Sequence, residues 1–454
     1  MRRAAITVLL AGLLTVLFAS PGGAGGGLTV VRPPRVQLGD ASLSGFAGAG
    51  SDQMRVMWQT TGEPDGDRFE AEFRGVGDDA WTTTPVESAT GPGSRVDHWA
   101  DFTGLDYNRQ YEYRIRHIRA GLLQTWTQAF FTRLASHDPR PFAFAAYGDS
   151  AWSEEIAPFE AVQRAVGESG ASFTLLLGDN AYNSGSAANL DARFQAPISA
   201  ALLAHHVEHV AFGNHDVGVD DGRPTEDGFA TPIPQAGRTA AAEPPEWERP
   251  EHNYSFDYGG VHFVTFDSNS ITSQARLEGL LNWVEADLAA SDATWKVVFT
   301  HHPVGAVVEH DDELLVYSYY AGLVANRLAE ARVDLFFVGH SHTYSWSYPL
   351  IGYDDGALQF VPDHDRSYRQ GEGFVQVVAG TGGRFLRPGE FDYPFIVSGF
   401  SLDSQPPAEH GFARIQVSSL QLKVEYIAAD DGSVLAAFSI VIPTPSFAAG
   451  RFAI

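Results

Sequence analysis

The chain has 454 residues, enough for two or three domains, and 44% of them are apolar, which is enough to bury a large core. Its 30 Lys and Arg residues against 56 Asp and Glu residues give a formal net charge of −26, which argues against nucleic acids and anionic membranes as primary partners. Cysteine is absent, and this excludes disulfides, thiolate metal sites, a cysteine nucleophile and a lipoprotein anchor.

The N-terminus has the features of a secretory signal peptide. Arg2 and Arg3 precede an apolar stretch over residues 4–19, and small residues suited to cleavage follow it. We therefore predict a signal peptide over residues 1–24 and a mature protein that is secreted, either extracellular or periplasmic. The alternative is an uncleaved anchor, but a membrane span needs about 20 apolar residues, and this stretch is shorter. No other segment is long and apolar enough to span a bilayer, so none is expected after cleavage.

The next segments are a Gly-rich linker, expected over residues 25–37, and a β-rich segment over residues 38–134. Within the β-rich segment, short runs alternate apolar and polar residues, as Met54, Val56 and Trp58 do, which is typical of half-buried strands. Several short strands without a helical period predict a β-sandwich. We interpret this segment as a structural domain, because it carries no cluster of metal ligands.

After a break at residues 135–141, short apolar runs alternate with helical patterns, which predicts an α/β domain over residues 141–440 and a tail over residues 441–454. The helical patterns cover residues 155–166, 275–289 and 319–331. Residues 218–252 form a long stretch rich in Pro, Gly and acidic residues, of the kind that borders a functional site or is disordered.

Five of the apolar runs end in residues that can bind metal ions. The endings are Gly148-Asp149, Gly178-Asp179-Asn180-Ala181-Tyr182, Gly213-Asn214-His215-Asp216, His301-His302-Pro303 and Gly339-His340-Ser341-His342. In open α/β sheets, ligands bind outside the carboxyl ends of the strands. A single Gly-Asp pair is more often a turn than a ligand, but five such endings in one chain indicate one site that gathers Asp, Tyr, Asn and His side chains.

These five motifs, in this order, resemble those of the calcineurin-like metallophosphoesterases. The tyrosine of the second motif, Tyr182, points to the purple acid phosphatase branch. The β-rich segment, with residues 98–105 followed by residues 111–114, is similar to the fibronectin type III-like domain that many of these enzymes carry. The resemblance covers residues 38–440 and implies a sandwich of two mixed sheets flanked by helices, with two metal ions at the ends of the sheets.

The resemblance implies seven ligands for two metal ions that share one carboxylate. The ligands of the first ion would be Asp149, Tyr182 and His342. The shared carboxylate would be that of Asp179. The other ligands of the second ion would be Asn214, His301 and His340. Anionic oxygens suit Fe(III), and an amide with two imidazoles suits a divalent ion, so we expect Fe(III) paired with Zn, Mn or Fe(II).

One departure from the family pattern follows the first ligand. Ser150 and Ala151 stand after Asp149, where the family usually has a glycine two residues on, and we expect this to alter a turn and not the ligand. His302 and Asp216 adjoin ligands, and we expect them to support those ligands rather than to bind the ions.

The candidate catalytic residues are two histidines. His215 resembles the substrate-facing histidine of the family, and His310 stands where plant-type enzymes have a histidine that contacts phosphate. Either could stabilise the transition state or protonate the leaving group. The acidic residues within 309–313 would alter substrate preference. The His-rich run over 205–209 lacks the spacing of a zinc helix, and we interpret it as a solvated helix end.

The predicted activity is hydrolysis of phosphate monoesters, acid phosphatase activity, by attack of a metal-bound hydroxide on phosphorus. Small phosphorylated molecules are the expected substrates. One alternative is a phosphodiesterase on the same fold, acting on cyclic nucleotides, nucleotide diesters or lipid head groups. A second alternative is a non-catalytic surface-binding protein with a decayed hydrolase domain, although the presence of all seven ligand types argues against decay.

Overall fold

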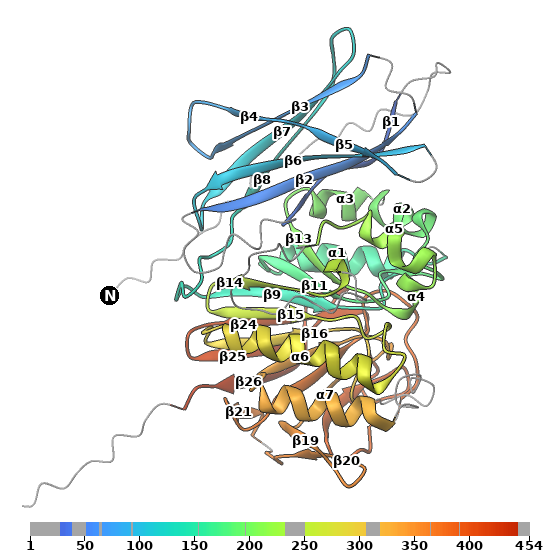
Figure 1. The fold of residues 1–454 in the computed structure, drawn as a ribbon. Coiled ribbons are helices and arrows are strands. Elements are labelled where there is room, and N and C mark those ends of the chain that lie inside the picture. Colours follow the sequence, from blue (N-terminus) through green and yellow to red (C-terminus); the bar gives the residue numbers. More distant parts are fainter. Residues whose placement is uncertain are drawn as a thin grey trace, which may run out of the picture.

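The computed structural model describes residues 28–38, 51–62, 66–91, 94–152, 154–195, 197–231, 250–305, 318–363, 365–389 and 391–443. Figure 1 shows an N-terminal part made of strands, drawn in blue, above a larger part in which helices flank sheets. The predicted order of a β-rich part followed by an α/β part is therefore confirmed. The predicted signal peptide and most of the predicted C-terminal tail lie outside the described residues.

The N-terminal part is a sandwich of two four-stranded antiparallel sheets, ordered β1-β2-β6-β5 and β4-β3-β7-β8. The strands are β1 (Thr29–Gln37), β2 (Asp52–Thr61), β3 (Arg68–Gly75), β4 (Thr82–Thr84), β5 (Glu87–Thr90), β6 (Arg95–Leu105), β7 (Gln110–Ile118) and β8 (Leu122–Phe131). Val56, Trp58 and Tyr113 are fully buried in one shared core. The alternating pattern therefore buries one face of each sheet, as two-sheet packing requires.

The expected linker over residues 25–37 is wrong from residue 29 onward, because Thr29–Gln37 form strand β1. Pro33 and Pro34 obscured this strand, since proline cannot donate a backbone hydrogen bond to a neighbouring strand. The prolines are tolerated because β1 is an edge strand and its register shifts between Arg32 and Arg35, where they lie.

The α/β part contains two seven-stranded mixed sheets. The first consists, in order, of β13 (Val207–Ala211), β11 (Phe173–Leu177), β9 (Phe142–Tyr147), β24 (Gly411–Val417), β25 (Gln421–Ala428), β26 (Val434–Val441) and β21 (Ser367–Arg369). The second consists, in order, of β14 (Tyr254–Tyr258), β15 (Val261–Thr265), β16 (Trp295–Phe299), β17 (Leu335–Val338), β22 (Val375–Ala379), β18 (Tyr344–Ser347) and β23 (Ile396–Phe400). Two short pairs accompany them, β10 (Ala151–Trp152) with β12 (Ala181–Tyr182) and β19 (Leu350–Asp354) with β20 (Ala357–Phe360).

Helices cover the outer faces of the two sheets. The helices are α1 (Ala157–Glu168), α2 (Ala187–Gln195), α3 (Pro197–Leu203), α4 (Asn214–Val217), α5 (Arg223–Glu226), α6 (Gln274–Ala290) and α7 (Ser318–Glu330), with 3₁₀ turns η2 (Asp220–Gly222) and η3 (Pro250–His252). Helices α1, α6 and α7 confirm the three predicted helical stretches to within two residues at each end. The helices α6 and α7 pack on the second sheet, and α1 packs on the first. Among the helices that the structure describes, none is long and apolar enough to cross a membrane.

The two sheets pack face to face. The ring of Phe144 on β9 lies edge-on to Phe263 of β15, with ring centres 5.2 Å apart, and also contacts Phe337 of β17. All three side chains are fully buried in the same core. This packing brings the ends of strands from both sheets to one place, which determines where the functional site forms.

Arginines of the sandwich tie it to the α/β part. Arg32 on β1 pairs with Asp191 on α2 at 2.9 Å, and Arg95 on β6 pairs with the same carboxylate. Arg35 donates two hydrogen bonds to the backbone carbonyl of Gly228, at 3.2 and 3.0 Å. Arg32 and Arg35 are almost fully buried, so losing either one's partners would leave a costly buried charge at the junction.

The prediction of a solvated helix end over residues 205–209 is correct only for His205, which is exposed in the turn after α3, and is wrong for the buried residues that follow. Val207–Ala211 form β13, whose residues are all buried. The ring of His209 stacks on Phe256 with ring centres 3.7 Å apart, and Glu208 pairs with Arg193 at 2.8 Å. Because this strand is covered on both faces, its sequence lacks the alternation that would have indicated a strand.

Candidate metal centre

The ligand motifs follow strands that run in the same direction. In the first sheet β9, β11 and β13 are parallel, and in the second β16 and β17 are parallel. Because each motif follows the carboxyl end of its strand, the motifs of each sheet meet at one edge. The face-to-face packing of the sheets then joins the two edges into one cluster of side chains.

Tyr182 lies at the centre of the first half of this cluster. Its Oη atom is 2.8 Å from Asp149 Oδ1, 2.7 Å from Asp179 Oδ2 and 3.0 Å from His342 Nε2. All four side chains are buried. The structure thus brings together the predicted ligands of the first ion with the predicted shared carboxylate.

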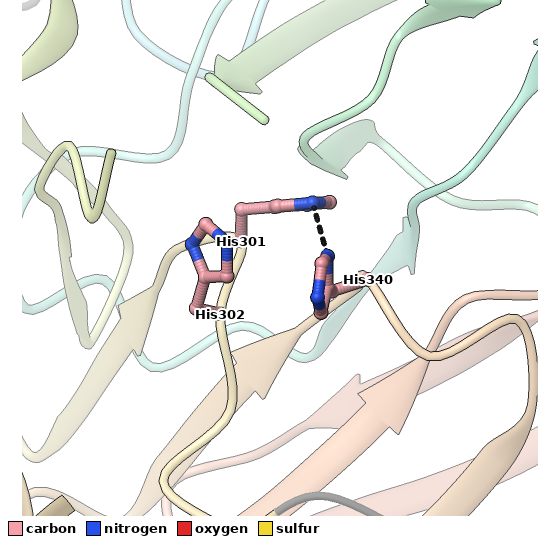
Figure 2. Close-up of side chains that lie close together, drawn as sticks. All are labelled: His301, His302 and His340. Atoms are coloured by element: carbon pink, nitrogen blue, oxygen red, sulfur yellow. Dashed lines mark hydrogen bonds between the residues drawn. The ribbon is translucent and has the colours of Figure 1, made fainter. Parts of the chain in front are cut away.

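His301 lies at the centre of the second half. Its Nε2 atom is 3.0 Å from Asn214 Oδ1, 3.1 Å from His340 Nδ1 and 3.5 Å from Asp179 Oδ1. Figure 2 shows the rings of His301 and His340 pointing toward each other from neighbouring strand ends. These are the four side chains that the sequence predicted for the second ion.

The carboxylate of Asp179 joins the two halves. Its Oδ2 atom faces Tyr182, and its Oδ1 atom faces His301 and accepts a hydrogen bond of 2.8 Å from the backbone N–H of His215. A carboxylate with one oxygen in each half has the geometry that two adjacent cations require in order to share it.

The orientation of the histidines tests whether these residues fit metal ions. His301 Nδ1 is 2.8 Å from the carbonyl oxygen of Leu177, and His342 Nδ1 is 2.9 Å from that of Phe385. A carbonyl oxygen only accepts, so each Nδ1 carries a proton and Nε2 is the atom that can bind a metal. His301 Nε2 then faces the oxygen of Asn214, which also accepts, so this contact is favourable only if a proton or a metal ion lies between the two atoms. The donor set therefore fits metal ions.

The electrostatics of the cluster agree with a site for cations. Burial raises the pKa of Asp149, but the hydrogen bond and charge of His342 outweigh it and lower this pKa to about 2. Burial lowers the pKa of His301, but the carboxylates of Asp179 and Asp149 outweigh it and raise this pKa. The cluster thus holds anionic oxygens in a buried place and favours positive charge beside them.

Glycines in the motifs give the carboxylates room. A Cβ atom at Gly213 would overlap Oδ1 of Asp179, and one at Gly339 or Gly380 would lie 2.8 Å from Oδ2 of Asp149. Asp149 itself has a left-handed backbone, with φ of 58°. Such a backbone is less favourable for a residue with a side chain than for glycine, and the proposed ligands Asp179 and His340 adopt it as well, with φ of 51° and 71°.

Asp216 lies behind the cluster and connects two of its loops. Its Oδ2 atom accepts hydrogen bonds of 2.8 Å from the backbone of Gly213 and from Nδ2 of Asn180. Burial and the charge of Asp179 raise the pKa of Asp216 to about 7. Asp216 therefore holds the loops of Asp179 and Asn214 together, as expected for a supporting residue.

His302 adjoins the second half of the cluster. Its Nδ1 atom is 2.7 Å from Oγ of Ser268, and its ring centre is 4.6 Å from that of His340. One nitrogen of each of His301, His302 and His340 lies within 4.8 Å of the others, so the geometry allows His302 to bind an ion as well as to support the ligands.

Of the two predicted catalytic histidines, only His215 lies within the described residues. The side chain of His215 is 36% exposed, its Nδ1 atom is 2.8 Å from the carbonyl oxygen of Asn183, and its ring lies 4.6 Å from that of Tyr182. It therefore covers the cluster from a side that solvent reaches. His310 and its acidic neighbours lie outside the described residues.

The departure from the family pattern after Asp149 forms a short parallel ladder. Ala151 pairs with Ala181, and Trp152 pairs with Tyr182. Asp149 lies in the cluster, with its Oδ1 atom 2.8 Å from Tyr182 Oη, while Ala151 takes part in this ladder.

Arg384 also lies at the cluster, although it was not among the residues predicted from the sequence. This residue follows β22, which runs parallel to β17 and ends at the same edge of the sheet. Its guanidinium carbon lies 4.7 Å from the ring centre of Tyr182. A sixth apolar run that ends in the glycine-rich turn Gly380-Thr381-Gly382-Gly383 is the signal that could have revealed it.

Comparisons with known proteins agree with both parts of the chain. A family model of the calcineurin-like phosphoesterases matches residues 142–344, and a model of the purple acid phosphatase N-terminal domain matches residues 44–133. A solved purple acid phosphatase, PPD1 from yellow lupin (Lupinus luteus) seeds, superimposes with a TM-score of 0.69 over 92% of this chain and 75% of its own, at 16% sequence identity. This match supports the fold, including the order of its two parts.

Curated relatives carry related names. An acid phosphatase of Aspergillus ficuum is 25% identical over 234 residues, which is 47% of this chain but only 36% of the fungal protein. A tartrate-resistant acid phosphatase type 5 of Sus scrofa is 25% identical over 306 residues, 62% of this chain and 79% of its own. The two family models match separate parts of the chain, one after the other. The chain therefore contains a calcineurin-like phosphoesterase domain, the domain of metal-dependent phosphoester hydrolases, preceded by a domain of the purple acid phosphatase N-terminal type.

Proposed function

We propose that the protein is an acid phosphatase that hydrolyses phosphate monoesters at a centre of two metal ions. The observation that carries this proposal is the carboxylate of Asp179, whose two oxygens face two separate groups of ligand side chains. That geometry supports a pair of ions a short distance apart, and such pairs bind both the attacking and the leaving oxygens of a phosphoryl group.

The two groups differ in chemistry, and this supports a mixed pair of ions. Asp149, Tyr182 and His342 would hold Fe(III), because two of these ligands offer anionic oxygen. Asn214, His301 and His340 would hold a divalent ion, Zn, Mn or Fe(II). Asp179 would serve both. When bound, such ions would supply positive charge to the phosphoryl oxygens and would lower the pKa of a coordinated water, which would provide the hydroxide that an in-line attack on phosphorus needs.

His215 is suited to proton transfer at this centre. The carbonyl of Asn183 fixes the proton of the ring on Nδ1, which leaves Nε2 free to exchange a proton on the side facing Asp179, 3.9 Å away. Because the side chain is partly exposed, a substrate can reach it. We assign it to protonation of the leaving alkoxide, a contribution of about 10²–10⁴-fold in rate. His310 remains a second candidate for the same role.

The signal-peptide features of residues 1–24 support a secreted protein, extracellular or periplasmic, that acts on small phosphorylated molecules. Orthophosphate released outside the cytoplasm would then be the product of the reaction.

The proposal is tested by comparing hydrolysis of nitrophenyl phosphate and of bis-nitrophenyl phosphate by the purified, metal-loaded protein. Faster turnover of the monoester at acidic pH, lost on chelation, is the expected result. A preference for the diester would favour the phosphodiesterase alternative. Two bound metal ions without turnover of either ester would favour a binding protein with a decayed hydrolase domain. Metal analysis together with a visible spectrum identifies the ions.

A further inference from the structure

Arg384 is a cation held by aromatic rings beside the candidate metal centre. Its guanidinium carbon lies 4.3 Å from the ring centre of Trp152, 4.4 Å from that of Phe385 and 4.7 Å from that of Tyr182. Its backbone N–H donates a hydrogen bond of 2.8 Å to the carbonyl oxygen of Asp149. The residue is therefore anchored to one proposed ligand through its backbone and stacked on another through its side chain.

The donors of this side chain have no acceptor among the described residues. The Nε and Nη1 atoms of Arg384 are buried without a hydrogen-bond partner there, and so is Nε1 of the neighbouring Trp152. Guanidinium and indole N–H groups only donate hydrogen bonds, so neither side chain offers an acceptor to the N–H groups of the other. Buried donors without acceptors are unfavourable, and three of them in adjacent side chains call for a group with several acceptor oxygens.

Two arginines elsewhere in the described part of the chain, Arg133 and Arg193, form buried ion pairs, which Arg384 does not. Arg133 pairs with Asp52 at 2.7 Å, and Arg193 pairs with Glu208 at 2.8 Å. Arg384 is only partly buried and forms no ion pair with a described residue. Because stacking rather than an ion pair holds it, the guanidinium can turn toward an incoming anion without breaking a salt bridge.

We propose that Arg384 binds the phosphoryl group of the substrate, and the phosphate that hydrolysis releases, beside the metal centre. This inference rests on the proposed phosphatase function. Phosphate offers pairs of oxygen atoms that match the fork of a guanidinium, and such charge-assisted pairs are among the strong hydrogen bonds of proteins. Arg384 would then determine affinity for phosphate, while the seven proposed ligands determine metal binding.

The test compares Arg384→Gln and Arg384→Lys with the wild type and with Arg74→Gln. Arg74 is a matched control, because its guanidinium also stacks on a tryptophan, Trp81, at 4.5 Å, but lies in the N-terminal sandwich. Three quantities are measured: metal content, calorimetric affinity of the metal-loaded protein for inorganic phosphate, and KM and kcat for nitrophenyl phosphate.

We expect Arg384→Gln to keep its metal ions and to bind phosphate at least about tenfold more weakly, with KM raised in parallel. The affinity of Arg384→Lys for phosphate should lie between those of Arg384→Gln and the wild type, because lysine keeps the positive charge but lacks the paired N–H donors of the guanidinium. The control Arg74→Gln should match the wild type in all three measurements. If the Gln variant does not fold, weaker phosphate binding by a fully metal-loaded Lys variant supports the proposal.

Phosphate affinity that is unchanged in folded, fully metal-loaded Arg384 variants would overturn this inference. So would a loss of metal in those variants, since Arg384 would then support Tyr182 rather than bind phosphate. Failure of the proposed function looks different: the wild type itself would hold metal ions and neither bind phosphate nor hydrolyse the ester.

Discussion

The backbone N–H of His340 donates a hydrogen bond of 2.8 Å to Oδ2 of Asp149, although 191 positions separate the two residues. Asp149 follows a strand of the first sheet, and His340 follows a strand of the second. The bond therefore fixes the two sheet edges to each other at the centre of the cluster. One proposed ligand of each metal ion takes part in it, so the position of one site depends on the position of the other.

Asp179→Asn should empty both metal sites. An amide cannot supply the two anionic oxygens that the proposed shared carboxylate offers, so we expect less than about one metal ion per chain and at least a 10²-fold loss of activity, on the scale of losing a charge-stabilising group at an active site. Metal analysis of the purified protein measures this. Asp355→Asn is the matched control, because Asp355 has φ of 48° and Asp179 has φ of 51°. A variant at Asp179 that retains two metal ions and normal turnover would disprove the sharing.

Gly213→Ala should weaken metal binding although it replaces none of the proposed ligands. Its new Cβ atom would overlap Oδ1 of Asp179 and displace the carboxylate, so we expect at least about a tenfold loss of activity. Gly260→Ala is the control, because its Cβ atom would meet nothing closer than 3.8 Å. Metal titrations of the two variants should differ. Equal metal affinity would show that the loop around Gly213 yields without moving Asp179.

Tyr182→Phe should keep the fold and lose the colour of the protein. Phenylalanine fills the same buried space but lacks the oxygen that would bind Fe(III), and a phenolate bound to Fe(III) produces the visible charge-transfer band. Some hydrolysis should remain, because Asp179 and His215 are unchanged. Tyr254→Phe is the control, because Tyr254 is equally buried and, among the described residues, its hydroxyl donates its hydrogen bond to the backbone carbonyl of Val210.

The visible spectrum of the iron-loaded, oxidised proteins is the measurement. A colourless wild type, or a Tyr182→Phe variant that keeps the band, would exclude tyrosine ligation and leave a centre of divalent ions.

His262 should make stability depend on pH. The buried ring lies 2.7 Å from Asp257 and 2.9 Å from Asp287, and although burial lowers its pKa, the two carboxylates outweigh burial and raise it from 6.5 to about 9. A histidine whose pKa rises on folding stabilises the fold fully at pH values below its pKa in the unfolded state. This stabilisation is lost as the pH rises through its pKa in the folded state. The free energy of unfolding contributed by His262 should therefore be about 3 kcal/mol near pH 6 and vanish toward pH 9.

Denaturant unfolding of the wild type and His262→Gln at several pH values measures this difference. His137→Gln is the control, because His137 and its partner Asp292 are largely exposed and their pair should contribute little. A difference between wild type and His262→Gln that stays constant from pH 6 to pH 9 would show that the ring is neutral in the folded protein.

The clustering of the candidate ligands could be predicted because each one adjoins a buried strand. Asp149, Asp179 and His301 lie in short motifs that follow apolar runs. Parallel strands end at the same edge of a sheet, so these motifs meet there regardless of the conformation of the loops that connect the strands. The pattern does not depend on the exact length or register of any strand. This is why residue types and their order along the chain were enough.

Other features depend on contacts that no local pattern encodes. The strand over residues 29–37 contains two prolines, and this pattern in the sequence indicates a linker. The prolines are compatible with a strand only because this strand lies at the edge of its sheet. Arg384 lies over Tyr182 because β22 pairs with β17, a contact between distant segments. A single arginine after a glycine-rich turn gives no indication of the rings that surround it in the folded chain.

The ion pair between Arg32 and Asp191 has a consequence for the order of folding, because 159 positions separate its partners. During synthesis from the N-terminus, every strand of the sandwich is made before Asp191, so the acceptors of Arg32 and Arg35 do not yet exist when β1 emerges. The contacts of β1 with the α/β part can therefore form only after α2 and the turn at Gly228 have been made, so docking of the sandwich onto the α/β part is a late, long-range step of assembly.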